Sequence, residues 1–171
     1  MIRHPKRRGE WVELQFMARA SAHGLIVSKP WGDSARYDFV VEHRGRFLRI
    51  QVKSTMHFYR GTYMCNTVSR PSQRKGSGRS YTARDIDFFA FSIIPEDVWY
   101  IVPISECRAR YAVQLNPYRR DNRYFPFLEA WHLLRQSRPP SANPQEHEIV
   151  RSRSKPAAKR RKRVAPGVSP G

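Results

Sequence analysis

Hydrophobic and polar residues alternate along two neighbouring stretches of the chain, residues 36–43 ("RYDFVVEH") and residues 46–55 ("RFLRIQVKST"). Successive side chains of a β-strand point to opposite faces, so this alternation is typical of strands with one apolar face. The two residues between the stretches include a glycine, which favours a tight turn. We therefore predict an antiparallel hairpin with one apolar face and one polar face.

The polar face of this hairpin carries an unusual set of side chains, because sheets tend to exclude Asp. A two-residue loop at 44–45 and a four-residue loop at 43–46 give the same register, in which Asp38 lies opposite Gln51. Lys53 follows on the same face, and opposed Cβ atoms in such a pair are ~5 Å apart. We expect Asp38, Gln51 and Lys53 to converge around one small ion or phosphate. The alternative is a polar face exposed to solvent.

The first helix is predicted over residues 9–24, which contain good helix formers and end at a glycine. At helical spacing, one face of this helix consists of Trp11, Leu14, Met17, Ala18 and Ser21. A closing helix that begins at Pro126 is predicted within residues 125–136.

Short strands are predicted before residue 30, within 56–68, at the end of 81–95 and within 97–104, and loops at 69–80 and 116–124. This order of elements predicts an α/β or α+β domain with a mixed central sheet flanked by helices.

Composition indicates the class of partner. Lys and Arg outnumber Asp and Glu by 32 to 14, which gives the 171-residue chain a net charge of +18. Nucleic acid is therefore the expected partner, with an anionic membrane surface as the rival. No run of 18 apolar residues is present and the basic N-terminus lacks the apolar stretch of a secretory signal, so we expect no membrane-spanning segment. Cys65 and Cys107 are expected to be reduced thiols of a cytoplasmic protein.

Positive charge is concentrated at the C-terminus, where residues 151–171 hold eight Lys or Arg and no acid. Such a segment has too few apolar residues to offset the entropy of ordering. We predict a folded domain over residues 1–137 and a disordered basic tail over residues 138–171. The tail is expected to contact nucleic-acid phosphates without sequence preference. The alternative is a tail that only aids solubility.

The polar hairpin face also resembles a known family. An acid on a first helix ("G-x-x-x-E", residues 9–13), a "PWGD" turn at 30–33, "YDFVV" at 37–41 and "RIQVK" at 49–53 follow one another in the sequence. Together they resemble the PD-(D/E)XK nuclease superfamily, and within it the branch of group I intron-encoded homing endonucleases. The resemblance is close over residues 9–55 and looser over residues 56–105.

What the resemblance implies is a restriction-endonuclease-like fold and a metal-dependent DNA endonuclease. Asp38, Gln51 and Glu13 match the metal-binding positions, with Mg²⁺ as the expected ion. Lys53 matches the lysine that positions water and offsets charge on the phosphate. Gln51 stands where most of the superfamily has an acid, although the narrower branch uses glutamine there. Glu10 competes with Glu13 as the helix acid.

Nucleic-acid contacts are predicted at two basic regions. The 69–80 loop is expected to close over phosphates through its four basic residues, Arg70, Arg74, Lys75 and Arg79. A second region holds Arg108, Arg110, Arg119, Arg120 and Arg123, with Tyr118 and Tyr124 as residues that could stack on bases or complete the core. The resemblance favours duplex DNA over RNA and a homodimer or homotetramer, because cutting both strands requires two sites. In a bacterium the protein would then be associated with the nucleoid.

Two other functions fit the same sequence. The neutral Gln51 and the basic surface also suit a catalytically inactive DNA-binding module on a nuclease fold. A basic structural or RNA-associated protein, in which the tail is the active part, is the third hypothesis. Metal-dependent DNA cleavage separates the first reading from both of these.

Overall fold

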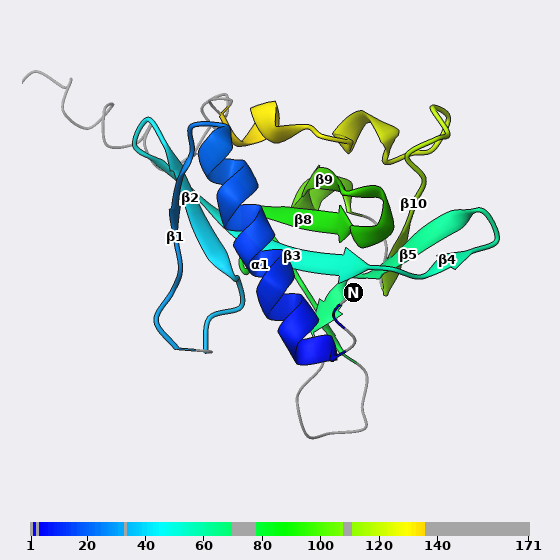
Figure 1. Ribbon diagram of the computed structural model, residues 1–171. Coiled ribbons are helices and arrows are strands. Elements are labelled where there is room, and N and C mark those ends of the chain that lie inside the picture. The colour runs from blue at the N-terminus through cyan, green and yellow to red at the C-terminus, as the bar shows by residue number, and fades with distance from the viewer. Residues whose placement is uncertain (1, 3, 33, 70–77, 108–110, 136–171) are drawn as a thin grey trace, which may run out of the picture. The chain divides into compact units, whose positions relative to one another are not determined.

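A mixed five-stranded sheet forms the centre of the computed structural model, which describes residues 2, 4–32, 34–69, 78–107 and 111–135 (Figure 1). Its strands are β1 (Ile26–Ser28), β2 (Phe39–His43), β3 (Arg46–Thr55), β8 (Phe88–Ile93) and β9 (Val98–Pro103), in the order β1-β2-β3-β8-β9. Only the β3–β8 pair of this sheet is parallel. The expected mixed central sheet is confirmed.

The predicted hairpin forms with the predicted register. His43 pairs with Arg46 and Phe39 with Ile50, so the loop has two residues, Arg44 and Gly45. Both residues have positive φ, 51° and 75°, which is the geometry of a tight hairpin turn. The apolar face of the hairpin is buried and β3 pairs next with β8, so this hairpin occupies the middle of the sheet.

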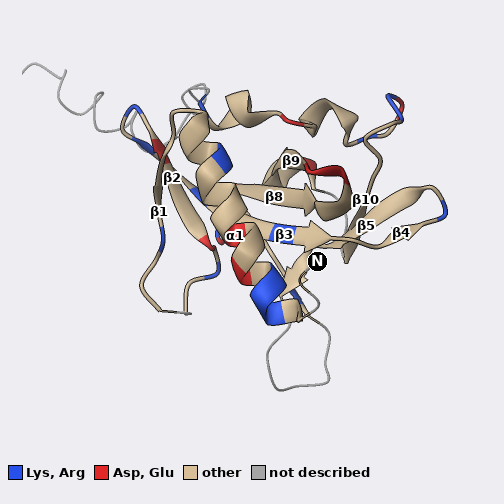
Figure 2. Cartoon of the chain, viewed as in Figure 1, with Lys and Arg blue, Asp and Glu red and all other residues tan. Residues whose placement is uncertain are grey.

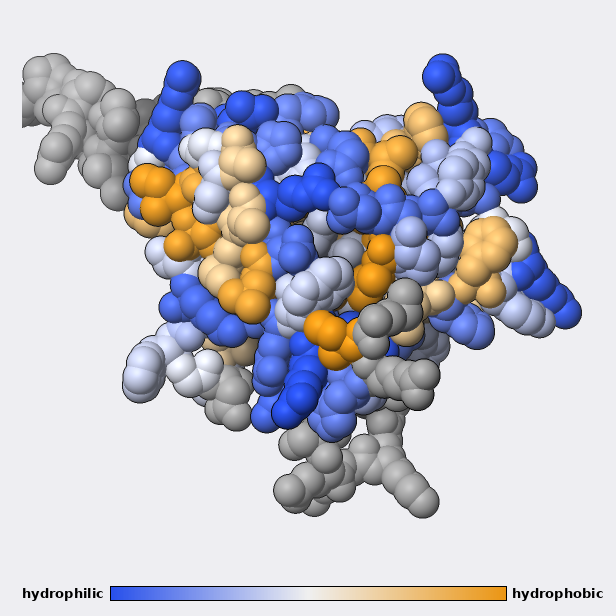
Figure 3. All heavy atoms as spheres, viewed as in Figure 1, coloured by the Kyte–Doolittle hydropathy of each residue, from blue (hydrophilic) through white to orange (hydrophobic). Residues whose placement is uncertain are grey.

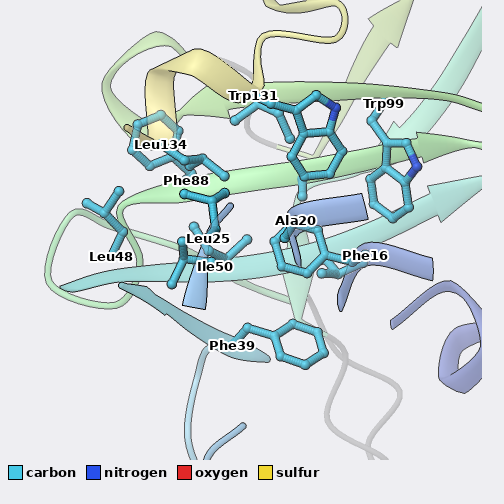
Figure 4. Close-up of a cluster of buried hydrophobic side chains, with 14 of the residues drawn as sticks. Phe16, Ala20, Leu25, Phe39, Leu48, Ile50, Phe88, Trp99, Trp131 and Leu134 are labelled. Atoms are coloured by element: carbon cyan, nitrogen blue, oxygen red, sulfur yellow. The ribbon is translucent and has the colours of Figure 1, made fainter. Parts of the chain in front are cut away.

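Helix α1 (Pro5–Ala22) covers one face of this sheet. It begins four residues earlier than predicted, because Pro5 suits the first turn of a helix, where no N–H partner is needed. The buried stripe of α1 is Val12, Phe16 and Ala20. Of the face that helical spacing indicates, Met17 packs against the core, whereas Trp11 and Leu14 are 37% and 58% exposed. The sheet selects the Val12–Phe16–Ala20 stripe because Phe16 packs against Phe39, with ring centroids 5.3 Å apart (Figure 4).

A three-stranded antiparallel sheet, in the order β10-β5-β4, covers the opposite face. It consists of β4 (Phe58–Tyr59), β5 (Thr62–Asn66) and β10 (Ala112–Leu115). Residues of this sheet, such as Cys65 and Leu115, share a buried cluster with Phe89 and Phe91 of β8. The described residues thus form two cores, one between α1 and the central sheet and one between the two sheets. Tyr124 is buried in the second core, so it completes the core rather than offering a stacking surface.

The predicted closing helix is wrong. Residues 125–135, the part of this segment that the structure describes, instead contain two 3₁₀ turns, η3 (Phe125–Phe127) and η4 (Trp131–Leu134). Glu129 between them has φ of 50°, and its backbone N–H donates to the Trp99 carbonyl at 2.7 Å. Its carboxylate accepts the Trp99 N–H at 2.6 Å and the Trp131 indole N–H at 2.8 Å. The two bonds to Trp99 of β9, together with the bond from Trp131, replace the hydrogen bonds of a continuous helix.

Two further 3₁₀ turns, η1 (Ile94–Glu96) and η2 (Ile104–Glu106), flank β9. The segment predicted as a loop over residues 69–80 is closed by a short ladder between β6 (Val68–Ser69) and β7 (Arg79–Ser80). Residues 138–171 lie outside the described residues, so the basic tail stays a prediction. No helix among the described residues is long and apolar enough to cross a membrane.

Candidate active site

Asp38 lies just before β2, and the register of the hairpin places it beside the middle of β3. Its backbone N–H donates to the Ile50 carbonyl at 2.9 Å, which extends the β2–β3 pairing by one residue. The Oδ2 atom of its carboxylate accepts the Val52 backbone N–H at 2.7 Å and the side-chain amide N–H of Gln51. The carboxylate is therefore fixed against β3 by backbone geometry as well as by a side chain.

Gln51 and Lys53 lie on the face of β3 that Asp38 approaches. Gln51 is 5% exposed, and its amide nitrogen also lies 3.3 Å from the Val52 carbonyl oxygen. Lys53 pairs with Phe91 of β8 and is half-buried, with its Nζ 5.5 Å from the ring centroid of Tyr81. The strand alternation predicted from the sequence thus brings Asp38, Gln51 and Lys53 together.

Glu13 lies on α1 and lines the same pocket as Asp38, Gln51 and Lys53. Its Oε2 atom lies 2.7 Å from the Nζ of Lys29, which follows β1 directly. Glu10, the competing helix acid, is exposed and borders only a neighbouring pocket of about 420 Å³ that Glu13 and Asp38 also line. Of the two acids, Glu13 is the one that reaches the polar side chains of β3.

These side chains open into one pocket of about 830 Å³. Its polar lining consists of Lys6, Arg8, Glu13, Asp38, Gln51, Lys53, Ser54 and Asn66. Figure 2 shows the corresponding acidic segments of α1 and of the start of β2 close to a basic segment of β3. A pocket that joins acid, amide and ammonium groups is suited to holding a cation and an anionic ligand together.

The electrostatics of the pocket follow from partial burial of its charges. Burial raises the pKa of Asp38, and the negative charge of Glu13 adds to the increase, while the Val52 N–H, Lys53 and Gln51 oppose it. Burial lowers the pKa of Lys53, an effect that the negative charges of Asp38 and Glu13 partly offset. The hydrogen bond from Lys29 to Glu13 raises the pKa of that lysine. A bound cation would relieve the repulsion between the two carboxylates.

Arg49 shares the polar strand face but takes no part in the pocket. Its guanidinium is held by both carboxylate oxygens of Asp87, each at 3.1 Å, and by the carbonyls of Ala83 and Arg84. The neighbouring Asp85 forms a 2.8 Å ion pair with Arg36. Asp85 and Asp87 therefore fix the entry to β8, as expected of acids that precede a strand.

The predicted nucleic-acid contacts are only partly described. Arg70, Arg74 and Lys75 lie outside the described residues, as does Asp33 of the "PWGD" turn. Arg79 is exposed at the start of β7, and its carbonyl accepts hydrogen bonds from Ser69 and Arg36. In the second basic region, Arg119 pairs with Asp121 and Arg123 with Glu106. Surface residues of the face seen in Figure 3 are mainly hydrophilic, with hydrophobic residues in separate patches.

Sequence reasoning missed the cations that surround the site. The pockets that Asp38 and Glu13 line are bordered by Lys6, Arg8 and Lys29. A further cation, Arg36, lies over the ring of Tyr81, which Lys53 also contacts. The register of the predicted hairpin places Arg36 opposite Lys53, which was the available signal for one of them. The described residues contain no cluster of three or more His, Cys, Asp or Glu side chains that could hold a metal. The acidic part of this site comprises only Glu13 and Asp38, with the Gln51 amide beside them.

Comparison with known proteins identifies the family of the chain. The model of a family described as PD-(D/E)XK endonuclease matches residues 3–134. A solved structure of a bacterial homing endonuclease, I-Ssp6803I, is 27% identical and superposes with a TM-score of 0.68 over 76% of this chain and 92% of that chain. No protein of curated function matches the sequence significantly. The expected restriction-endonuclease-like fold is confirmed, and the chain belongs to the PD-(D/E)XK endonuclease family.

Proposed function

We propose that this endonuclease-family protein cleaves duplex DNA in a Mg²⁺-dependent reaction. The observation that carries the proposal is that Glu13, Asp38, Gln51 and Lys53, from α1 and two paired strands, line one pocket of about 830 Å³. Two carboxylates, an amide and an ammonium are the groups needed to hold a divalent cation against a phosphodiester.

The donor set fits magnesium. Mg²⁺ prefers hard oxygen ligands and keeps several waters, so one or two carboxylates beside a phosphate suffice. Asp38, Glu13 and the amide oxygen of Gln51 would hold the ion. Gln51 now directs its amide nitrogen at Asp38, so its side chain would have to turn to offer oxygen. When bound, the ion would polarise the phosphate and make bound water more acidic.

The residues of the chain have separate tasks in this proposal. The Val52 N–H keeps Oδ2 of Asp38 in place, which fixes the orientation of the carboxylate towards the pocket. Lys53 would stabilise the negative charge that develops on the phosphate, and its half-buried position strengthens that interaction. Lys29 neutralises Glu13 until substrate and cation enter.

The DNA strand would follow a line of connected pockets. The neighbouring pocket of about 420 Å³ shares Pro5, Lys6, Gly9, Glu13 and Asp38 with the central one. On the other side a pocket of about 490 Å³ shares Arg8, Ser54 and Asn66 with it and reaches His57 and Met64. The cations along this path, Lys6, Arg8, Lys29 and Lys53, would neutralise phosphates.

Several finer expectations belong to the same proposal. The 69–80 loop and the basic tail over residues 138–171 would add contacts to phosphates that do not depend on sequence. A homodimer or homotetramer would supply two sites for the two strands. A protein with this activity would work in the cytoplasm, at the nucleoid if the cell is bacterial.

The proposal is tested by nicking of supercoiled plasmid with Mg²⁺, with Asp97→Asn as a control for Asp38→Asn. Asp97 is an exposed acid paired with Arg19, outside the pockets. We expect Asp38→Asn and Lys53→Ala to slow cleavage by at least about a hundredfold, the cost of removing a charge that stabilises the transition state. DNA binding measured in EDTA should persist. Cleavage at the wild-type rate by both site variants would refute the assignment.

A DNA-binding module without catalysis is the second candidate, because Gln51 supplies no charge for the metal. It would bind DNA but cut no form of it with Mg²⁺ or Mn²⁺, and its melting temperature would not respond to either ion.

A further inference from the structure

Lys53 is held by an aromatic ring. Among the described residues, no carboxylate forms a salt bridge with its ammonium. Its Nζ instead lies 5.5 Å from the ring centroid of Tyr81. A cation within about 6 Å of an aromatic centroid is attracted by the ring quadrupole, more strongly where water is partly excluded. The half-buried position of both residues meets that condition.

The ring of Tyr81 is itself fixed by several contacts. The guanidinium carbon of Arg36 lies 4.8 Å from the same centroid. Phe89 meets the ring edge to face, with centroids 5.4 Å apart and an interplanar angle of 85°. Tyr81 therefore lies between the core of the central sheet and two cations, which leaves its ring little freedom.

The backbone around Tyr81 is also held. Arg36 donates hydrogen bonds to the carbonyls of Arg79 and Ser80 and forms a 2.8 Å ion pair with Asp85. Asp85 in turn accepts the backbone N–H and the hydroxyl of Thr82, both at 2.9 Å. These contacts tie the backbone on both sides of Tyr81 to Arg36, which lies two residues before Asp38.

We propose that Tyr81 is a positioning residue of the active site, whose ring keeps the Lys53 ammonium beside Asp38 and Gln51. The inference rests on the proposed function. A flexible lysine side chain would otherwise sample many rotamers, and fixing it in advance lowers the cost of forming the transition state. The ring rather than the hydroxyl does this, because the named contacts of Tyr81 are ring contacts.

The test changes the electrostatics of the ring at nearly constant shape. Tyr81→Phe is compared with the same chain carrying 3,4,5-trifluorophenylalanine at position 81, whose fluorines withdraw charge from the ring face. We expect Tyr81→Phe to cleave supercoiled plasmid within about twofold of the wild-type rate under single-turnover conditions with Mg²⁺. The fluorinated protein should be roughly threefold to tenfold slower than Tyr81→Phe, where tenfold corresponds to ~1.4 kcal/mol in the barrier.

Tyr81→Leu removes the ring, and Phe47→Leu is the matched control because Phe47 is 64% exposed on the same strand as Lys53, outside the pockets. Cleavage by Tyr81→Leu should fall about tenfold, whereas Phe47→Leu should cleave normally. The melting temperatures of the Tyr81→Phe and fluorinated proteins should agree, as should their affinities for DNA in EDTA. A purely structural role predicts this agreement too, but does not predict slower cleavage by the fluorinated ring.

Equal cleavage by the Phe and fluorinated proteins would overturn the inference, as would normal cleavage by Tyr81→Leu. If Tyr81→Leu fails to fold, the Phe and fluorinated pair decides alone. A wild-type protein that cuts no DNA would instead refute the proposed function, so the two failures are distinguishable.

Discussion

The side-chain amide N–H of Gln51 donates to the same carboxylate oxygen of Asp38 that accepts the Val52 backbone N–H. Two neighbouring groups of β3 thus converge on one oxygen of an acid that precedes β2. The neutral Gln51 allows this closed arrangement without a cation, whereas a second carboxylate at position 51 would repel Asp38.

Gln51→Glu tests that relationship. In EDTA we expect the variant to be less stable by about 1–3 kcal/mol, because a hydrogen bond becomes a repulsion between a buried and a half-buried acid. With Mg²⁺ it should recover stability and need less Mg²⁺ for half-maximal cleavage, because a second carboxylate binds the ion more strongly. Thermal melting with increasing Mg²⁺ measures the first effect and plasmid nicking the second. Gln114→Glu, on the exposed side of β10, is the control and should change neither.

Gly9→Ala should raise the free energy of unfolding and at the same time lower the affinity for DNA. Gly9 lies inside α1, where alanine is favoured by roughly 0.5–1 kcal/mol. An added Cβ would meet no protein atom within 4 Å, yet Gly9 borders both pockets that Asp38 lines. A DNA strand in that space would meet the methyl group, so we expect DNA affinity to fall about threefold, or ~0.6 kcal/mol. Ser21→Ala, exposed at the other end of α1, should stabilise the fold without weakening DNA binding. Stabilisation with unchanged DNA affinity for Gly9→Ala would argue against a strand lying on α1.

The double variant Lys6→Ala with Arg8→Ala should weaken binding to all DNA sequences alike. Both residues line the central pocket. The slope of log affinity against log salt is negative, and its magnitude should fall by about 0.9 for each phosphate-binding cation that is removed. Fluorescence anisotropy over a salt series measures this slope, and Arg19→Ala should leave it unchanged because Arg19 pairs with Asp97 away from the pockets. An unaltered slope in the double variant would place the phosphates elsewhere.

The interactions of Asp85 predict that the free energy of unfolding depends on pH. Burial favours its neutral form, but the N–H and hydroxyl of Thr82, together with Arg36, hold the pKa of Asp85 below its usual range. A carboxyl with a lower pKa in the folded state stabilises the protein above its unfolded pKa, and this contribution is lost as the pH falls through the folded pKa. Asp85→Asn should therefore cost about 1 kcal/mol at most at pH 7 and progressively less below about pH 4. Urea unfolding across this range measures the difference, which should not grow as the pH falls.

Glu129→Ala should destabilise the fold strongly. Its carboxylate accepts hydrogen bonds from the Trp99 backbone and the Trp131 indole, and both tryptophans are buried. Loss of a charged acceptor leaves two buried donors unsatisfied, at roughly 2–4 kcal/mol in total. Glu106→Ala removes an exposed 3.6 Å ion pair and should change the unfolding free energy by less than about 0.5 kcal/mol. Equal effects of the two variants in urea would show that Glu129 has no special structural role.

Much of the candidate site could be predicted from short-range order. The turn at Arg44 and Gly45 sets the register of the hairpin, and alternation along each strand then places Asp38 against Gln51. Neither step needs a distant part of the chain. The choice of the helix acid depends on tertiary structure, because Glu10 and Glu13 lie one turn apart and, of the two, Glu13 lines the central pocket.

Other features depended on contacts between distant segments. Trp11 and Leu14 have the spacing of one helical face, but the sheet packs against the stripe of α1 that contains Phe16. Residues 125–136 contain good helix formers, yet Glu129 bonds to β9, 30 residues earlier in the chain, and the helix does not form. Tyr81 reaches Lys53 from a segment nearly 30 residues away, and no local pattern indicates that contact.

Neighbouring residues and composition are enough to specify the β2–β3 hairpin, its register and the excess of positive charge. Contacts between distant segments select which face of α1 is buried, the 3₁₀ turns within residues 125–135 and the ring that holds Lys53. Those outcomes are set by competition among distant partners for the same surface, and local propensity is too weak to decide that competition.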